Sequence, residues 1–239
     1  MNRWICTLFS AFTICCCVAA QNQSGTKRFD RGAWSGAATA LLTPSPGDWT
    51  SSSTQTIPSP DKQKIIHVKD HNVLFETRQR EFPTDFGYKT NAELGWAPDS
   101  SRFFLTWTTG GELGVWKTEV YQVSETGLTE LKGIGQNAIR DFDHQIRQLP
   151  PPKDFAKEPG LSYWLGLHYC EPNLVGSQWL NGSKELLVSV LVPNTSYCRY
   201  MSEFNVYRIA VPSGQILQRY TAQEAHRTFR RENLPIIVR

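Results

Sequence analysis

The feature that most constrains the fold is a pattern that occurs twice, in which a tryptophan, a turn and an apolar strand follow one another. The first copy runs from Trp96 through Pro98 and Asp99 into the segment 102–109, and the second begins at Trp179, 83 residues after the first tryptophan. In 102–109 the residues alternate between a strongly apolar face and a mixed one, which is typical of a strand. Proline presets φ, and aspartate can bond its own backbone two residues on, so the residues before this strand predict a turn.

The likeness between the two copies continues downstream of the first strands. The segment from Tyr121 to Gly127 matches the segment from Tyr207 to Gly214, with one residue inserted before the hydroxyl-glycine turn of the second copy. Each copy then continues into a short final strand. A succession of strands and short turns of this kind predicts antiparallel pairing of neighbouring strands.

A weaker third copy precedes the other two and suggests a period. Its Asp61 lies 38 residues before Asp99, and the 83 residues between the two tryptophans are close to two further periods of that length. Four-stranded propeller blades repeat at about this interval. The sequence therefore predicts an all-β fold of four-stranded antiparallel, propeller-like blades. One short helix is expected at 137–147, where apolar residues recur at helical spacing after Asn137, a plausible cap.

The segment Trp96-Ala-Pro-Asp-Ser-Ser-Arg-Phe103 resembles the repeat of TolB-type β-propellers, in which Trp-Ser-Pro-Asp-Gly leads into a hydrophobic strand. The resemblance implies that the Pro-Asp turn joins the first two strands of a blade and that the tryptophan packs between blades. Ser100 stands where that repeat usually has glycine, and Asn181-Gly182 replaces Pro-Asp in the second copy. Two clear copies and one weak copy are fewer than the four blades of a closed ring. A minimal or incomplete ring is therefore expected, with an antiparallel β-sandwich as the alternative.

The N-terminal residues 1–20 have the pattern of a secretory signal. Arg3 precedes an uncharged, mostly apolar run from Trp4 to Ala20, which is shorter than the roughly 20 residues that span a bilayer. Cleavage would leave an extended leader at 21–56, rich in Ser, Thr, Gly and Ala, and a single domain at 57–239. The expected location is secreted or periplasmic, with no membrane span after signal removal. A lipid anchor is disfavoured because no small residue outside the cysteine run precedes Cys15–Cys17.

Cysteine and charge add two further expectations. Of the six cysteines, only Cys170 and Cys198 lie beyond the signal segment, and two cysteines in an oxidising compartment predict one disulfide, with two separate thiols as the alternative. Lys and Arg number 25 and Asp and Glu 22, with no dense basic block. This balance gives no electrostatic reason to propose nucleic acid as a partner.

Motifs for chemistry are sparse, so the sequence predicts no catalytic, cofactor-binding or metal-binding residue. Asp141, Asp143 and His144 could offer ligands to a cation, but a solvated helix face is the favoured interpretation. His67 lies in an apolar strand and has no evident partner for general-base chemistry. We therefore expect an exported, non-catalytic module that binds an unknown protein or small ligand. The alternatives are a secreted hydrolase that uses propeller-end loops, and a structural module completed by self-association into a homodimer.

Overall fold

The computed structural model describes residues 39–40, 54–69, 72–78, 80–84, 92–108, 115–149, 171–192, 203–229 and 234. The signal segment, Cys170 and Cys198 lie outside the described residues, so the cleavage and the disulfide stay predictions. Two strands fall in the segment 21–56, which the sequence assigns to an extended leader: β1 (Thr39–Ala40) and β2, which begins at Thr54.

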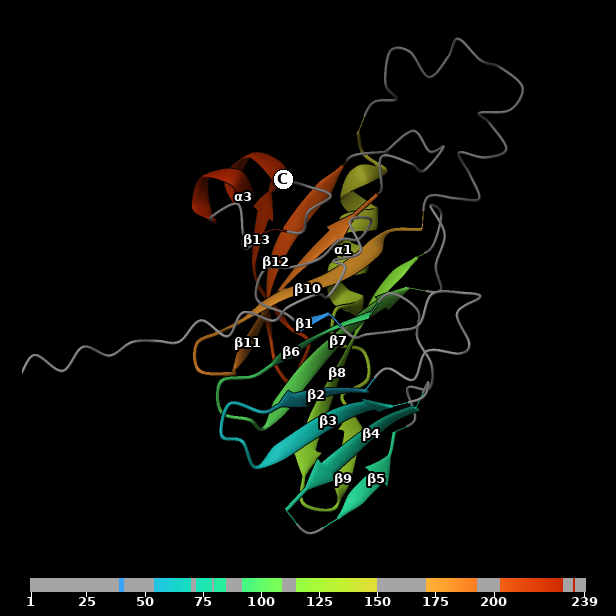
Figure 1. Cartoon of the computed structure of the whole chain (residues 1–239). Helices are drawn as coiled ribbons and strands as arrows, with labels where there is room; N and C mark the ends of the chain where they lie inside the picture. The colour runs from blue at the N-terminus through green and yellow to red at the C-terminus, as the bar shows by residue number, and fades with distance from the viewer. Residues whose placement is uncertain are drawn as a thin grey trace, which may run out of the picture.

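Three antiparallel sheets follow one another along the chain (Figure 1). The first sheet contains β2 (Thr54–Pro58), β3 (Lys64–Lys69), β4 (Asn72–Thr77) and β5 (Glu81–Pro83). The second contains β6 (Ala92–Trp96), β7 (Arg102–Thr108), β8 (Trp116–Ser124) and β9 (Gly127–Glu130), with β1 paired to the edge of β6. The third contains β10 (Asn173–Leu180), β11 (Glu185–Leu191), β12 (Phe204–Ala210) and β13 (Ile216–Thr221). The prediction of an all-β fold built from four-stranded antiparallel sheets is confirmed.

The three sheets stack in the order of the sequence, because each is apolar on the face that meets its neighbour. One core cluster joins the first sheet to the second, with Ile66 and Phe75 packed against Phe103 and Leu105. A second cluster joins the other face of the second sheet to the third sheet; its members include Phe104, Val120, Leu186, Val188 and Ile209. The arrangement of these sheets as a propeller stays a prediction.

The repeat period of 38 residues has a direct structural counterpart in the first two sheets. The amide of Ser59 donates to the carbonyl of Lys64, and the amide of Ala97 donates to the carbonyl of Arg102, both over 2.8 Å. The residue at the same place in each turn, Lys62 or Ser100, has φ of 58° or 59°. The weak copy in the sequence is therefore a true structural repeat of the second sheet.

Helix α1 (Gln136–Ile146) confirms the helix expected at 137–147, but its cap is not Asn137. The N-cap is Gly135, with φ of 89° and no side-chain hydrogen bond, and a Cβ there would collide with Leu174. The helix buries Ala138, Phe142 and Ile146 in the cluster that joins the second and third sheets. Glycine is suited to the cap position because the backbone there has a left-handed conformation and passes too close to β10 to leave room for a side chain.

Helix α3 (Ala222–Thr228) was not expected, although its start carries a sequence signal. Thr221 accepts a hydrogen bond from the amide of Glu224, whose carboxylate accepts one in return from the amide of Thr221. This Thr-x-x-Glu capping box is readable in the sequence. The helix covers the outer face of the third sheet, where Ala225 and Leu234 are fully buried beside Val206.

Candidate functional site

Pro98 and Asp99 lie in the turn that joins the first two strands of the second sheet, as the sequence predicts. Asp99 Oδ1 accepts hydrogen bonds from the Ser101 amide over 2.9 Å and from the Ser101 hydroxyl over 2.7 Å. Burial pushes the pKa of Asp99 upward, but the hydrogen bonds from Ser101 and Ser183 outweigh it and hold the pKa below the ordinary value. The carboxylate is thus used to fix the turn.

The equivalent turn of the first sheet has the same construction. Asp61 Oδ1 accepts from the Ser59 hydroxyl over 2.6 Å and from the Gln63 amide over 2.9 Å. Burial acts to raise the pKa of Asp61, but these bonds and the Lys64 charge outweigh it and lower the pKa to about 2. A carboxyl held so strongly in its ionised form is suited to a structural turn and not to proton donation.

These turns are linked to one another from sheet to sheet. The amide of Asp61 donates to the hydroxyl of Ser100 over 3.0 Å, and the amide of Asp99 donates to the hydroxyl of Ser183 over 3.3 Å. Ser100 and Ser183 occupy the same place in their turns, and both have positive φ. We call this series of bonds the turn ladder.

The two repeat tryptophans lie at successive junctions between sheets. Trp96 packs edge-on against Phe103, with ring centroids 5.2 Å apart, in the cluster shared by the first and second sheets. Trp179 belongs to the next junction, where its indole nitrogen donates to the carbonyl of Gly95 over 2.8 Å. Both tryptophans are therefore partly buried and belong to the packing between sheets.

The four remaining repeat residues are also structural, and two of them are not equivalent. Tyr121 pairs with Phe103 across β7 and β8, whereas Tyr207 pairs with Val188, two residues along β11 from the residue that matches Phe103. The alignment of these tyrosines made from the sequence is therefore wrong by two residues. Gly127 and Gly214 do share a role, since both follow the third strand with positive φ, 136° and 69°.

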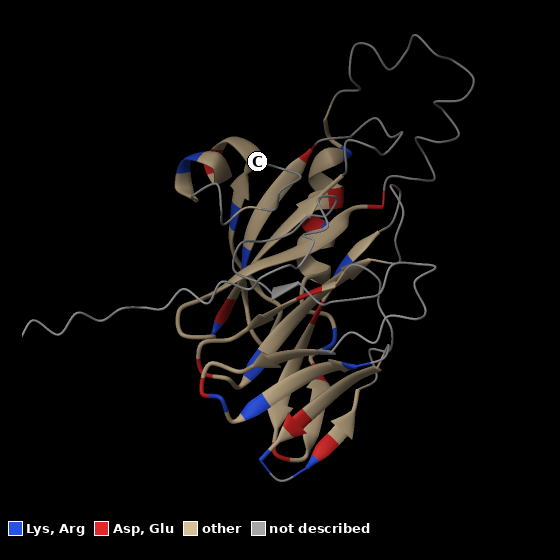
Figure 2. Cartoon of the chain, in the orientation of Figure 1, with Lys and Arg blue, Asp and Glu red and all other residues tan. Residues whose placement is uncertain are grey.

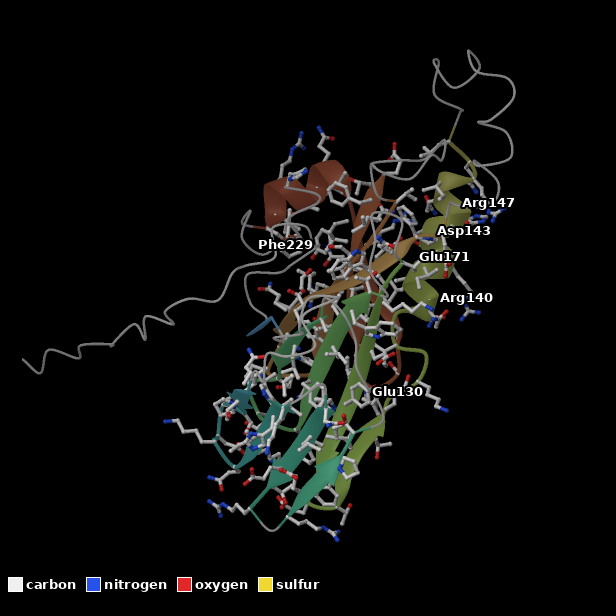
Figure 3. All side chains as sticks on the ribbon, turned by 45° about the vertical axis from the view of Figure 1, so that its right-hand side comes forward. Glu130, Arg140, Asp143, Arg147, Glu171 and Phe229 are labelled. Carbon is white, nitrogen blue, oxygen red and sulfur yellow. The ribbon has the colours of Figure 1, made fainter. Side chains whose placement is uncertain are left out.

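The two aspartates of α1 have partners within the fold. Asp141 accepts a 3.0 Å hydrogen bond from the hydroxyl of Tyr207 and lies 3.2 Å from the guanidinium of Arg219. Burial raises the pKa of Tyr207, so this hydroxyl stays protonated and donates. Asp143 pairs with Arg147 on the exposed side of the helix (Figure 3). In the part of the chain that the structure describes, no group of three or more His, Cys, Asp or Glu side chains could hold a metal ion.

The outer face of the first sheet is the candidate interaction surface. We define this end face by Thr56, Ile65, His67, Leu74 and Glu76, which alternate along β2, β3 and β4 with the residues buried against the second sheet. Thr56 is exposed and the others are half-buried. Charged residues of both signs lie on this sheet (Figure 2). No other described sheet covers the end face, which combines apolar and polar groups as non-obligate interfaces do.

Histidine 67 has a partner that the sequence did not reveal. Its Nε2 lies 2.6 Å from Oε2 of Glu76, and its Nδ1 lies 3.4 Å from the hydroxyl of Thr56. A hydroxyl, an imidazole and a carboxylate in one row have the composition of an acyl-transfer triad. The hydroxyl lies beyond the 2.6–3.2 Å range of an effective hydrogen bond to a base, and the row lies on a face that no other described sheet covers. These distances favour a hydrogen-bonded surface pair over a nucleophile.

Comparison with known proteins provides no relative on which to rest a function. No family model, no curated protein and no solved structure matches the chain. Among the helices of the described residues, none is both long and apolar enough to cross a membrane.

Proposed function

We propose that this chain is an exported, non-catalytic binding protein of the cell envelope or extracellular space, and that the end face of the first sheet is its contact surface. The observation that carries the proposal is the position of this face. The equivalent faces of the second and third sheets are buried against a neighbouring sheet, whereas this face meets no other described sheet.

The composition of the end face supports recognition. Ile65 and Leu74 supply apolar area outside the core clusters, and His67 and Glu76 supply polar groups beside it. Interfaces between proteins that also exist separately are about as apolar as ordinary protein surface, and their polar groups fix orientation. The carboxyls with lowered pKa in the described residues stabilise turns, a helix cap and a strand pair, which favours binding over catalysis.

A site-specific photo-crosslinker tests the contact surface. The full chain carries the crosslinking amino acid at position 74 or, as a matched control, at Leu217, a leucine that is 45% exposed on the third sheet. Irradiation of the source cells should give a discrete adduct from position 74 and none from position 217. Equal adducts at both positions, or no adduct at position 74, would overturn the assignment of the end face.

Export is tested separately by sequencing the N-terminus of the chain recovered from cell fractions. We expect the recovered chain to begin at Gln21 and to lie outside the cytoplasm, because cleavage after Ala20 removes the signal pattern. A chain that keeps its first twenty residues in the cytoplasmic fraction would contradict the proposal.

A further inference from the structure

The three sheets place equivalent residues in one cross-strand row, on the face that points toward the preceding sheet. In the first sheet this row is Pro58, Ile65, Glu76 and Glu81. In the second sheet it is Trp96, Phe103, Tyr121 and Glu130. In the third sheet it is Trp179, Leu186, Ile209 and Ile216.

The rows of the second and third sheets are built for burial against another sheet. Phe103, Leu186 and Ile209 are each 0% exposed, and the two tryptophans cover the ends of their rows. The first sheet differs at the same places. Glu76 replaces the equivalent of Tyr121, and it faces Glu81 directly across the next strand.

The neighbouring row shows the same replacement. His67 in the first sheet and Leu105 in the second sheet are equivalent. His67 lies two residues after Ile65 on β3, and Leu105 lies two residues after Phe103 on β7. The side chain of His67 is 22% exposed and that of Glu76 is 43% exposed, and the two form the 2.6 Å pair. A second sheet packed on this face would remove the pair from water, which is costly without new hydrogen bonds.

The turn ladder ends at the same sheet for an independent reason. Each link needs an amide from the preceding sheet and a hydroxyl from the following one, as in Asp61 to Ser100 and Asp99 to Ser183. The residue at the hydroxyl position of the first sheet is Lys62. If the third sheet of a second copy packed on the end face, its Gly182 amide would face Lys62. A lysine side chain can donate hydrogen bonds but cannot accept them.

We propose that the first sheet is a capping sheet, whose outer face ends the stack and excludes a second copy of this chain. Terminal repeats of stacked architectures need a polar outer face for solubility. The opposite end of the stack is also closed, because α3 and Leu234 cover the apolar outer face of the third sheet. The inference rests on the rows and the turn ladder and does not require that the end face bind another molecule.

The experiment compares the native mass of the wild-type chain with that of a variant in which the cap is made like the second sheet. The variant carries His67→Leu and Glu76→Tyr, the residues found at the equivalent positions. Lys117→Leu with Thr129→Tyr is the matched control, since both residues are exposed on the second sheet. All chains are expressed at full length and measured by light scattering over a concentration series.

We expect a monomeric wild type, a monomeric control and a cap variant that self-associates with a dissociation constant at least tenfold lower than that of the control. A wild-type chain that forms a stable dimer would overturn the proposal, as would a cap variant that associates no more than the control. If the double variant does not fold, as judged by circular dichroism, His67→Leu alone provides the same comparison. Photo-crosslinking at position 74 reports on partners and not on mass, so the two proposals fail separately.

Discussion

The two junctions between sheets differ in how they are held together. The first and second sheets meet mainly through apolar side chains, with the Asp61 to Ser100 bond at one end. The second and third sheets share a buried polar network: Thr118 donates to the Leu174 carbonyl over 3.0 Å, and the Gly176 amide donates to Thr118 over 2.8 Å. An apolar contact tolerates small shifts, whereas hydrogen bonds in a buried junction require one geometry.

The second junction is also the closer of the two. Phe104 is fully buried between Gly95 of its own sheet and Gly176 of the third sheet, and a Cβ at either glycine would collide with its ring. Trp179 lies beside the same ring, with centroids 6.3 Å apart. The second and third sheets are therefore joined by close packing and buried hydrogen bonds, whereas the first sheet is attached to the second mainly by apolar contact.

The largest effect is expected for Phe104→Ala. Removing a fully buried phenylalanine leaves a cavity, which costs about 3–5 kcal/mol. Because the ring contacts both sheets of the second junction, we expect the free energy of unfolding to fall by this amount in denaturant titrations, with the second and third sheets losing protection together in hydrogen exchange. A loss below about 1 kcal/mol would contradict the account of this junction.

Ile66→Ala is the matched change at the first junction, because Ile66 occupies the position of Phe104 in the repeat. We expect faster amide exchange in β2 to β4, while β10 to β12 keep their protection. Equal loss of protection across all three sheets would show that the two junctions are equally tight.

A smaller effect is expected when the polar network of the second junction is cut by Thr118→Val. The change keeps the side-chain shape but removes the donor to Leu174 and an acceptor of the Gly176 amide. Leaving a buried polar group without a partner costs about 1–3 kcal/mol. Thr129→Val, at an exposed position of β9, is the control and should be close to neutral in thermal melts.

The two tryptophans sharpen the comparison further. Trp179→Phe removes the 2.8 Å bond to the Gly95 carbonyl and should cost about 1 kcal/mol. Among the described residues the buried indole nitrogen of Trp96 has no hydrogen-bond partner, so Trp96→Phe should be neutral or stabilising apart from the lost ring area. Chemical denaturation of both variants measures the loss in the free energy of unfolding. A larger loss from Trp96→Phe than from Trp179→Phe would contradict the conclusion that the second junction is the more specific one.

The smallest effect concerns acid stability. Because the pKa of Asp61 is lowered to about 2 in the folded chain, its contribution is fully present above its unfolded value, near 4, and is lost as pH falls toward 2. Asp61→Asn should therefore show a shallower decline of unfolding free energy between pH 4 and pH 2 than the wild type. Parallel declines in the two proteins would show that the turn carboxylate does not contribute.

The sequence predicted what depends on local patterns. Alternation of apolar and polar residues predicted the strands, and the spacing of Asp61 and Asp99 predicted the repeat period. Apolar residues at helical spacing predicted α1. The alignment of Tyr121 with Tyr207 failed because residues two positions apart lie on the same face of a strand, so alternation fits both registers and only cross-strand pairing distinguishes them. The capping box at Thr221 was readable, but a helix so short has little periodicity to support it.

The junctions and the end face could not be predicted, because they depend on partners distant in the sequence. Thr118 and Leu174 are 56 residues apart, and nothing in either segment indicates the other. His67 and Glu76 lie on neighbouring strands, but their exposure depends on which face of the first sheet meets the second. Which face of the first sheet is buried depends on the order in which the sheets stack, and this order cannot be predicted from the sequence.

The turn ladder has a mechanical consequence. Its two bonds lie at the tips of the first hairpins, one at each junction, so each bond is a point about which two neighbouring sheets can rotate while the bond keeps its length. At the second junction the Thr118 network, midway along the strands, blocks this rotation. At the first junction the described contacts along the strands are mainly apolar, so we expect the angle between the first and second sheets to vary more easily than the angle at the second junction.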